Sequence, residues 1–158
     1  MYYPRTERQS RFMAIAEELA PIFAARAASH DHEGSFPHEN FADLRRVGLP
    51  LLVIPEEFGG WGANLSETLM TMEELAIGDG STALSLTMHM QTMGHVAQTR
   101  SWPEALYETV CRDIVARGAL INALATEPEL GSPSRGGKPK TVAEPIYANG
   151  ATPSAWCI

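Results

Sequence analysis

The feature that most constrains the fold of this chain is a change of sequence pattern at Gly118. Before it, five segments repeat apolar residues at helical spacing; after it, short apolar runs alternate with turns that contain glycine and proline. Helices that are followed by strands, without alternation, are typical of an α+β order. We therefore predict a mostly α chain of the α+β class, with a helical domain over residues 1–118 and the beginning of a β-domain over residues 119–158.

The five predicted helices are bounded by capping residues. They cover residues 6–29, 41–47, 65–77, 81–98 and 101–117, with Asn64, Ser81 and Ser101 as N-caps and Gly48 and Gly118 at C-terminal ends. Glu67, three residues after Asn64, predicts a capping box at the start of the third helix. Pro21 lacks a backbone donor, so it is expected to kink or split the first helix, and a polar linker should follow at residues 30–33.

The predicted core comes from the apolar stripes of these helices. The fourth helix is apolar nearly all round, which is typical of a central helix, so we expect it to be the most buried element. The stripe of the third helix is predicted as Leu65, Leu69, Met72 and Ala76, and that of the fifth as Leu106, Val110 and Ile114.

Three strands are predicted after Gly118, at residues 119–126, 141–147 and 154–158. The second contains Pro145, and a loop with many glycines and prolines separates it from the first. Two strands and a started third leave unpaired edges. We therefore expect the sequence to be a truncated piece of a longer protein.

Charge and cysteine content exclude several classes of function. A formal net charge of -7 argues against a nucleic-acid partner, and without a run of 18 apolar residues no membrane span is expected. Cys111 and Cys157 match no metal-ligand spacing, and His89 and His95 are not an i, i+4 pair, so we predict no metal site. Cys111 falls on an apolar helix face, which favours a buried, reduced thiol and a cytoplasmic location.

Residues 125–132 form the segment most suggestive of binding. The predicted strand ends in Thr126, a turn stiffened by Pro128 follows, and Gly131-Ser132 closes the segment. Free backbone N–H groups and two hydroxyls at a strand end can line a planar, polar cofactor or a phosphate. The same composition also describes an ordinary strand end followed by turn caps.

Three stretches are distinctive by their order and spacing, and the resemblance that they carry covers nearly the whole chain. They read Ile54-Pro55-Glu56-Glu57-Phe58-Gly59-Gly60-Trp61-Gly62, then Met72-Glu73-Glu74-Leu75-Ala76, then Thr126-Glu127-Pro128-Glu129-Leu130-Gly131-Ser132. Together they resemble the acyl-CoA dehydrogenase family. The resemblance implies an all-helical N-terminal domain, a middle β-domain and a C-terminal four-helix bundle, of which this chain holds the first and the start of the second.

The resemblance also implies a function. It indicates part of a flavoprotein oxidoreductase of the EC 1.3 class that performs α,β-dehydrogenation of an acyl-CoA thioester in fatty acid metabolism. Hydride would pass to FAD and then to an electron-transfer acceptor, in a homo-oligomer such as a homotetramer. It places Leu124, Ala125, Thr126, Gly131 and Ser132 at FAD, and Ser132, Met88 and His89 at the acyl-CoA substrate.

The resemblance assigns no catalytic residue to this chain, because the family's catalytic Glu would lie beyond Ile158. We therefore expect the chain alone to be inactive and to bind FAD weakly or not at all. Glu129, Leu130, Pro133 and Ala123 depart from the residues frequent in the family, which leaves the substrate open.

Alternatives remain at each level. His89 fits a core histidine with a backbone partner at least as well as a substrate contact, and Met88 fits plain core packing. The whole chain also fits a non-catalytic helical interaction module, or part of a flavin-dependent monooxygenase that shares the fold.

Overall fold

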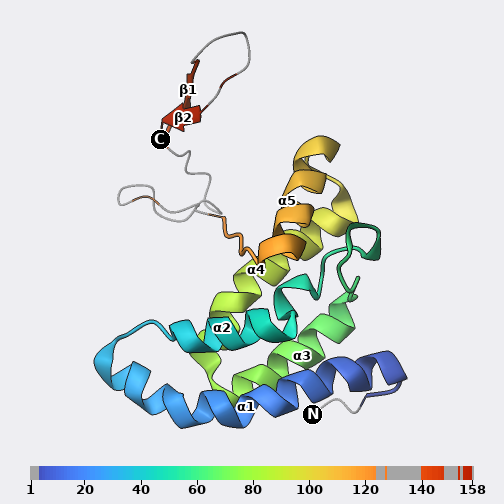
Figure 1. The fold of residues 1–158 in the computed structure, drawn as a ribbon, viewed down its shortest axis with the longest axis vertical. Coiled ribbons are helices and arrows are strands. Elements are labelled where there is room, and N and C mark those ends of the chain that lie inside the picture. The colour runs from blue at the N-terminus through green and yellow to red at the C-terminus, as the bar shows by residue number, and fades with distance from the viewer. Residues whose placement is uncertain (1–3, 124–126, 128–139, 148–152, 154, 158) are drawn as a thin grey trace. The chain divides into compact units, whose positions relative to one another are not determined.

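The computed structural model describes residues 4–123, 127, 140–147, 153 and 155–157. The chain divides into two compact units, Met1–Asn122 and Ala123–Ile158. In the described residues the first unit contains five α-helices and two 3-10 turns, and the second contains a pair of short strands (Figure 1). This mostly helical arrangement confirms the predicted fold class.

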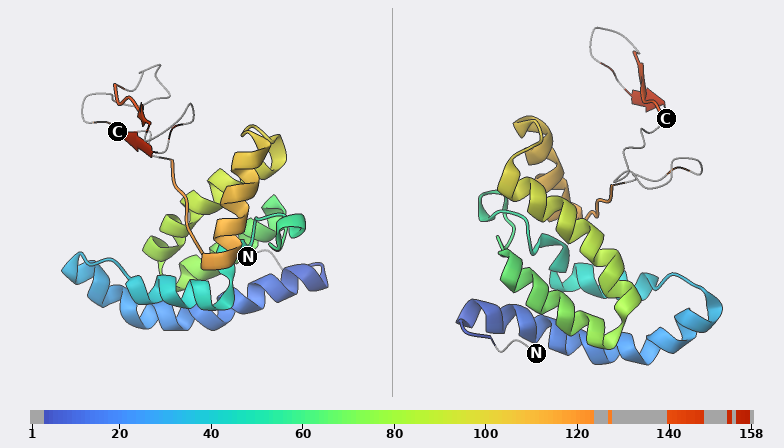
Figure 2. Two further views of the ribbon diagram at one scale, coloured as in Figure 1. Left: turned by 45° about the horizontal axis from the view of Figure 1, so that its top comes forward. Right: turned by 180° about the vertical axis from the view of Figure 1, so that it is seen from behind.

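Helix α1 (Glu7–Glu33) runs without a break through Pro21 and ends at Gly34, whose φ is 64°. Of the two outcomes predicted at Pro21, a kink or a split, the split is wrong, and so is the polar linker predicted at residues 30–33. The physical reason is tertiary: one continuous axis buries apolar side chains on both sides of the proline, among them Phe12, Ala16, Leu19 and Phe23. Figure 2 shows α1 lying alongside α3 from two further directions.

Helix α2 (His38–Val47) ends at Gly48, as predicted. Gly48 has φ 80°, a left-handed conformation that favours glycine, and a Cβ there would lie 3.0 Å from the Trp61 ring. The chain then passes through two 3-10 turns, η1 (Leu49–Leu51) and η2 (Glu56–Phe58). The second turn lies within the glycine-rich loop, residues 56–62.

The glycine-rich loop folds back on the residues that precede it. Trp61 N donates to Leu51 O at 2.9 Å, and Gly62 N donates to Ile54 O at 2.8 Å. Gly60 lies so close to this backbone that a Cβ would meet the Ile54 carbonyl oxygen at 2.1 Å. Glycine is therefore required at position 60 by close packing of the backbone.

Helix α3 (Leu65–Gly78) begins with the predicted capping box. Asn64 Oδ1 accepts from Glu67 N, and Asn64 N donates to Glu67 Oε2, both at 2.9 Å. The predicted apolar stripe is confirmed at Met72 and wrong at its other positions, because Leu65 and Leu69 are 65% and 53% exposed and Ala76 is also exposed. The buried residues are instead Glu67, Thr68, Met70, Thr71, Met72 and Leu75.

Threonine hydroxyls explain why a partly polar face of α3 can be buried. Thr68 Oγ1 donates to Asn64 O at 2.9 Å, and Thr71 Oγ1 donates to Glu67 O at 2.8 Å. Each hydroxyl is thus hydrogen-bonded within its own helix, so its burial leaves no unpaired polar atom in the core. The spacing of apolar residues alone therefore selected Leu65 and Leu69 of α3 for the core, although the face that is buried carries these threonines.

Helix α4 (Gly80–Thr99) is capped by Asp79 rather than by the predicted Ser81. The Asp79 carboxylate accepts from Ser81 N at 3.1 Å and from Thr82 N at 3.2 Å. The helix is not apolar and buried all round, because Leu84 is 65% exposed. Its buried side carries Thr82, Ala83, Leu86, His89, Met90, Met93 and Val96.

Helix α5 (Glu104–Arg117) starts after Pro103, which is the N-cap and makes no side-chain capping bond, so the predicted cap at Ser101 was wrong. Its C-terminal end at Gly118, with φ 61°, is as predicted. The buried residues are Tyr107, Cys111 and Ile114, whereas Leu106 of the predicted stripe is 50% exposed. Cys111 is buried and free, as expected.

The first predicted strand does not form over its described part, residues 119–123, and residues 124–126 lie outside the described residues. A strand requires a neighbouring strand to share its hydrogen bonds. Here Ile121 N donates instead to the ring of His89 on α4, at 3.2 Å.

The other two predicted strands are present in the described residues, and the one predicted at residues 141–147 is shorter than expected. β1 (Glu144–Ile146) pairs antiparallel with β2 (Ala155–Cys157), and Pro145 lies opposite Trp156. Pro145 is tolerated because a two-stranded pair leaves one side of each strand without a ladder. Among the residues that the structure describes, no helix has the length and apolar character that crossing a membrane requires.

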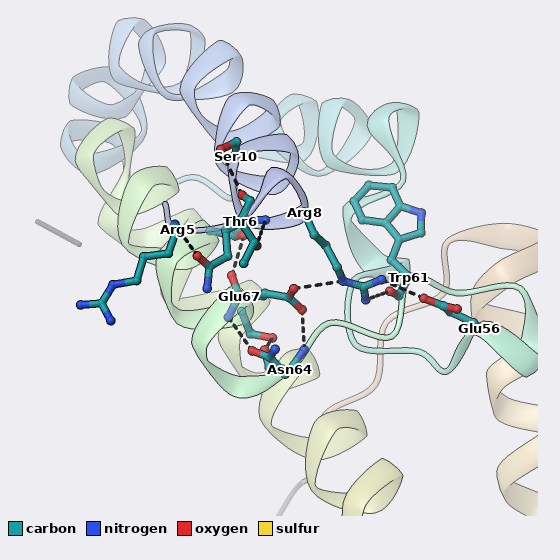
Figure 3. A network of polar contacts seen from close by, with 11 residues as sticks. Arg5, Thr6, Arg8, Ser10, Glu56, Trp61, Asn64 and Glu67 are labelled. Carbon is teal, nitrogen blue, oxygen red and sulfur yellow. Dashed lines mark hydrogen bonds and ion pairs between the residues drawn. The ribbon is translucent and has the colours of Figure 1, made fainter. Parts of the chain in front are cut away.

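A polar network ties the start of α1 to the glycine-rich loop and to α3 (Figure 3). Arg8 donates from Nη1 to Glu56 Oε1 at 2.8 Å, from Nε to Glu67 Oε1 at 3.0 Å, and from Nη2 to the Trp61 carbonyl. Glu67 is only 5% exposed, so Arg8 provides charge compensation for a buried carboxylate.

We expect Arg8→Met to lower the free energy of unfolding by about 1–3 kcal/mol, because the buried Glu67 carboxylate loses its cation and keeps the Asn64 amide. Urea unfolding followed by circular dichroism measures this loss. Arg11→Met is the matched control, since Arg11 lies over the Phe12 and Trp61 rings. Adding Glu67→Gln to Arg8→Met should recover part of the lost free energy of unfolding. Equal losses for Arg8→Met and Arg11→Met would contradict the charge compensation of Glu67 by Arg8.

Candidate functional site

An apolar groove of about 400 Å³ lies between α3 and α4. On the α3 side it is lined by Leu65, Leu69 and Met72, so two of the leucines that were predicted for the core form its wall. On the α4 side Met90 and Gly94 line it, where a larger residue at position 94 would fill part of the space. We call this feature the α3–α4 groove.

One side of the groove is polar. Gln91, His95 and Gln98 lie at i, i+4 and i+7 on α4, are exposed, and line the groove. Thr87 also lines it, but its hydroxyl donates to Ala83 O at 2.9 Å. An apolar floor beside amide and imidazole groups suits a ligand with an apolar body and a polar group.

The predicted substrate residues Met88 and His89 are not among the residues that line the groove. Met88 is half-buried, so its assignment to substrate stays a prediction. His89 is 1% exposed, and its Nε2 lies 2.9 Å from the Pro50 carbonyl while its Nδ1 accepts from Ile121 N. Both ring nitrogens therefore bond to backbone groups, which is the core arrangement that the sequence left open as an alternative.

The five residues predicted at FAD, namely Leu124, Ala125, Thr126, Gly131 and Ser132, lie outside the described residues. Glu127 of the same segment is described, and its carboxylate accepts from Lys140 N and from Thr141 N, both at 2.8 Å. Hydrogen bonds from the Thr141 side chain and from these amides lower the pKa of the Glu127 carboxyl. Glu127 thus binds the backbone that leads into β1.

In the described part of the chain, no group of three or more His, Cys, Asp or Glu side chains gathers in a way that could hold a metal ion.

Sequence reasoning missed the groove because Leu65 and Leu69 have the spacing of a core stripe. A usable signal was present on the other wall, where the polar residues Gln91, His95 and Gln98 recur at helical spacing on a helix that is otherwise apolar. Which apolar face of a helix remains uncovered depends on its neighbours, so this signal could not by itself locate a groove.

Comparison with protein families matches residues 6–104 to the acyl-CoA dehydrogenase N-terminal domain. YdbM of Bacillus subtilis (strain 168), which carries the name of an acyl-CoA dehydrogenase, is 37% identical over 137 residues, which are 87% of this chain and 36% of that protein. Dibenzothiophene monooxygenase of Rhodococcus erythropolis is 30% identical over 112 residues, which are 70% of this chain and 27% of that protein. The chain spans about a third of the length of the curated relatives that it matches.

Two solved structures share the fold of the chain. KijD3, solved in complex with dTDP, is 31% identical, with a TM-score of 0.68 over 75% of this chain and 32% of that one. The nitrososynthase of Micromonospora carbonacea var. africana is 25% identical, with a TM-score of 0.67 over 74% of this chain and 33% of that one.

Proposed function

Because the chain belongs to the acyl-CoA dehydrogenase family, we propose that it is the N-terminal part of a flavoprotein oxidoreductase that dehydrogenates an acyl-CoA thioester. The observation that carries this proposal is the family match over residues 6–104, which includes the glycine-rich loop, α3 and α4. The assignment of residues 119–158 to a β-domain is part of the same proposal, as are a fatty acid pathway, an electron-transfer acceptor, a homotetramer and a cytoplasmic location.

Two described residues, Ile121 before the predicted FAD segment and Glu127 within it, have backbone or side-chain partners in the structure. Before it, Ile121 is bonded to His89, and within it, Glu127 accepts two backbone amides. When bound, FAD would supply the hydride acceptor. Within this proposal Leu124, Ala125, Thr126, Gly131 and Ser132 hold the flavin through backbone and hydroxyl groups.

The substrate would use the groups of the helical unit. The α3–α4 groove offers an apolar floor, with Gln91, His95 and Gln98 available to orient a polar group. Ser132 remains the predicted contact of the thioester, and Met88 a predicted contact of the acyl pocket. The Glu127 carboxylate accepts two backbone amides, so we do not propose it as the base.

A monooxygenase is the second candidate, because the relatives include a dibenzothiophene monooxygenase at 30% identity and a nitrososynthase of the same fold. The two candidates differ in what reduces the flavin. Adding an acyl-CoA ester without oxygen should bleach the flavin absorbance of a dehydrogenase, whereas a monooxygenase requires a separate reductant. Bleaching by none of a series of acyl-CoA esters would favour the monooxygenase.

We expect Thr126→Val to weaken FAD binding by the protein expressed from its natural gene by about 0.5–1.5 kcal/mol, because the substitution keeps the shape and removes one hydrogen bond. Quenching of flavin fluorescence measures the dissociation constant. Thr109→Val is the control, since the Thr109 hydroxyl lies on exposed α5 and donates to Ala105 O. An unchanged dissociation constant for Thr126→Val would contradict this placement of the cofactor.

A further inference from the structure

One buried side chain, His89, joins two segments that are far apart in sequence. It lies on α4, is 1% exposed, and has its Nε2 2.9 Å from the carbonyl of Pro50 in η1. Its Nδ1 lies 3.2 Å from the amide nitrogen of Ile121, after the end of α5. The ring therefore bridges the turn after α2 to the segment after α5.

The two partners determine which ring nitrogen carries the proton. A carbonyl such as that of Pro50 only accepts, so Nε2 must donate to it; an amide such as that of Ile121 only donates, so Nδ1 must accept. His89 is thus neutral and held in the Nε2–H tautomer. Burial lowers the pKa of His89, which agrees with the neutral form.

The segment that His89 holds makes no strand pairing over residues 119–123. Three residues of this segment are partly buried and pack against the core, namely Ala119, Leu120 and Ile121. Such apolar contacts are non-directional, so they do not fix the register of the backbone. A hydrogen bond to one amide does set a register, because it fixes the position of a single backbone atom.

We propose that His89 is a positioning residue for the flavin segment: by accepting the Ile121 amide, it sets the point from which the chain continues to Thr126. Thr126 follows Ile121 by five positions, which is at most about 18 Å of extended chain. This inference rests on the proposed flavoprotein function. It replaces the predicted substrate contact of His89 by a role that acts through Ile121.

Two substitutions separate the two hydrogen bonds of His89. In His89→Gln the side-chain amide can donate from near the Nε2 position to Pro50, but no acceptor then occupies the Nδ1 position opposite the Ile121 amide. In His89→Asn the side-chain oxygen lies near the Nδ1 position and can accept from Ile121. The matched control is His95→Gln, which changes an exposed histidine of the same helix.

The first measurement uses the unchanged 158-residue protein. Nuclear magnetic resonance should show the Nε2–H tautomer of His89 and a coupling between the Ile121 amide nitrogen and Nδ1 across the hydrogen bond. Amide hydrogen exchange at Ile121 should then be roughly 2- to 13-fold faster in His89→Gln and close to the parent in His89→Asn and His95→Gln. The opposite tautomer, or no coupling, would overturn the proposal even if His89→Gln failed to fold.

The second measurement is FAD affinity in the protein expressed from its natural gene. His89→Gln should weaken binding by roughly 2- to 13-fold, and His89→Asn should restore most of it, which a merely structural role would not produce. If the parent binds FAD and His89→Gln binds equally well, the positioning role is wrong while the flavoprotein function stands. If the parent binds no FAD, the proposed function itself has failed.

Discussion

Gly78→Ala is expected to lower the free energy of unfolding of the helical unit by about 3 kcal/mol or more. A Cβ at position 78 would lie 2.2 Å from the carbonyl oxygen of Ala20 and 2.7 Å from its Cα. These atoms belong to the backbone of α1, so no change of side-chain rotamer can relieve the overlap. Helices α1 and α3 would have to separate, although they pack against each other more extensively than other helix pairs of the unit.

Urea unfolding of parent and variant measures the loss at position 78. Gly80→Ala is the matched control, because a Cβ at Gly80 would meet no atom within 4 Å. The control should unfold within about 0.5 kcal/mol of the parent. Similar midpoints for the two alanine variants would show that α1 and α3 do not approach each other as closely as the structure describes.

Met93→Asp is expected to cost about 3–5 kcal/mol, because it buries a carboxylate without a partner. Met93 is 0% exposed on the side of α4 that faces the core. Met88 lies on the same helix but is half-buried, so Met88→Asp should cost clearly less, since water can reach the new charge. The sequence predicts burial of this helix nearly all round, whereas the described burial separates the two positions.

Thermal unfolding followed by circular dichroism compares these aspartate variants. Met93→Leu is the control for the loss of methionine itself, and a change of similar volume should cost less than about 1.5 kcal/mol. Equal melting temperatures for Met93→Asp and Met88→Asp would contradict the described rotation of α4.

Features that depend on a few neighbouring residues were predicted correctly from the sequence. The capping box of α3 joins Asn64 to Glu67, and the left-handed conformations at Gly48 and Gly118 end α2 and α5. Each depends on hydrogen bonds or sterics within one turn of chain, so the local residues determine it. The order of helices before strands followed from the same local signals.

Errors arose where a distant element decides the outcome. Pro21 did not split α1, because packing against the rest of the helical unit stabilises one continuous helix on both sides of it. Leu65 and Leu69 form a groove wall rather than core, because the rotation of α3 brings Thr71 and Leu75 inward. Apolar spacing describes a face of a helix but does not indicate which neighbour will cover it.

The candidate site also has features that the local sequence determines and features that only distant elements determine. Residues 126–132 and the glycine-rich loop indicate the family by their order alone, as the match over residues 6–104 bears out for the helical part. The role of His89 could be decided only in three dimensions, since its partners Pro50 and Ile121 lie 39 and 32 positions away. A histidine on an apolar helix can contact a ligand or pack in the core. The atoms opposite its ring determine which of the two it does, and these atoms come from other elements of the fold.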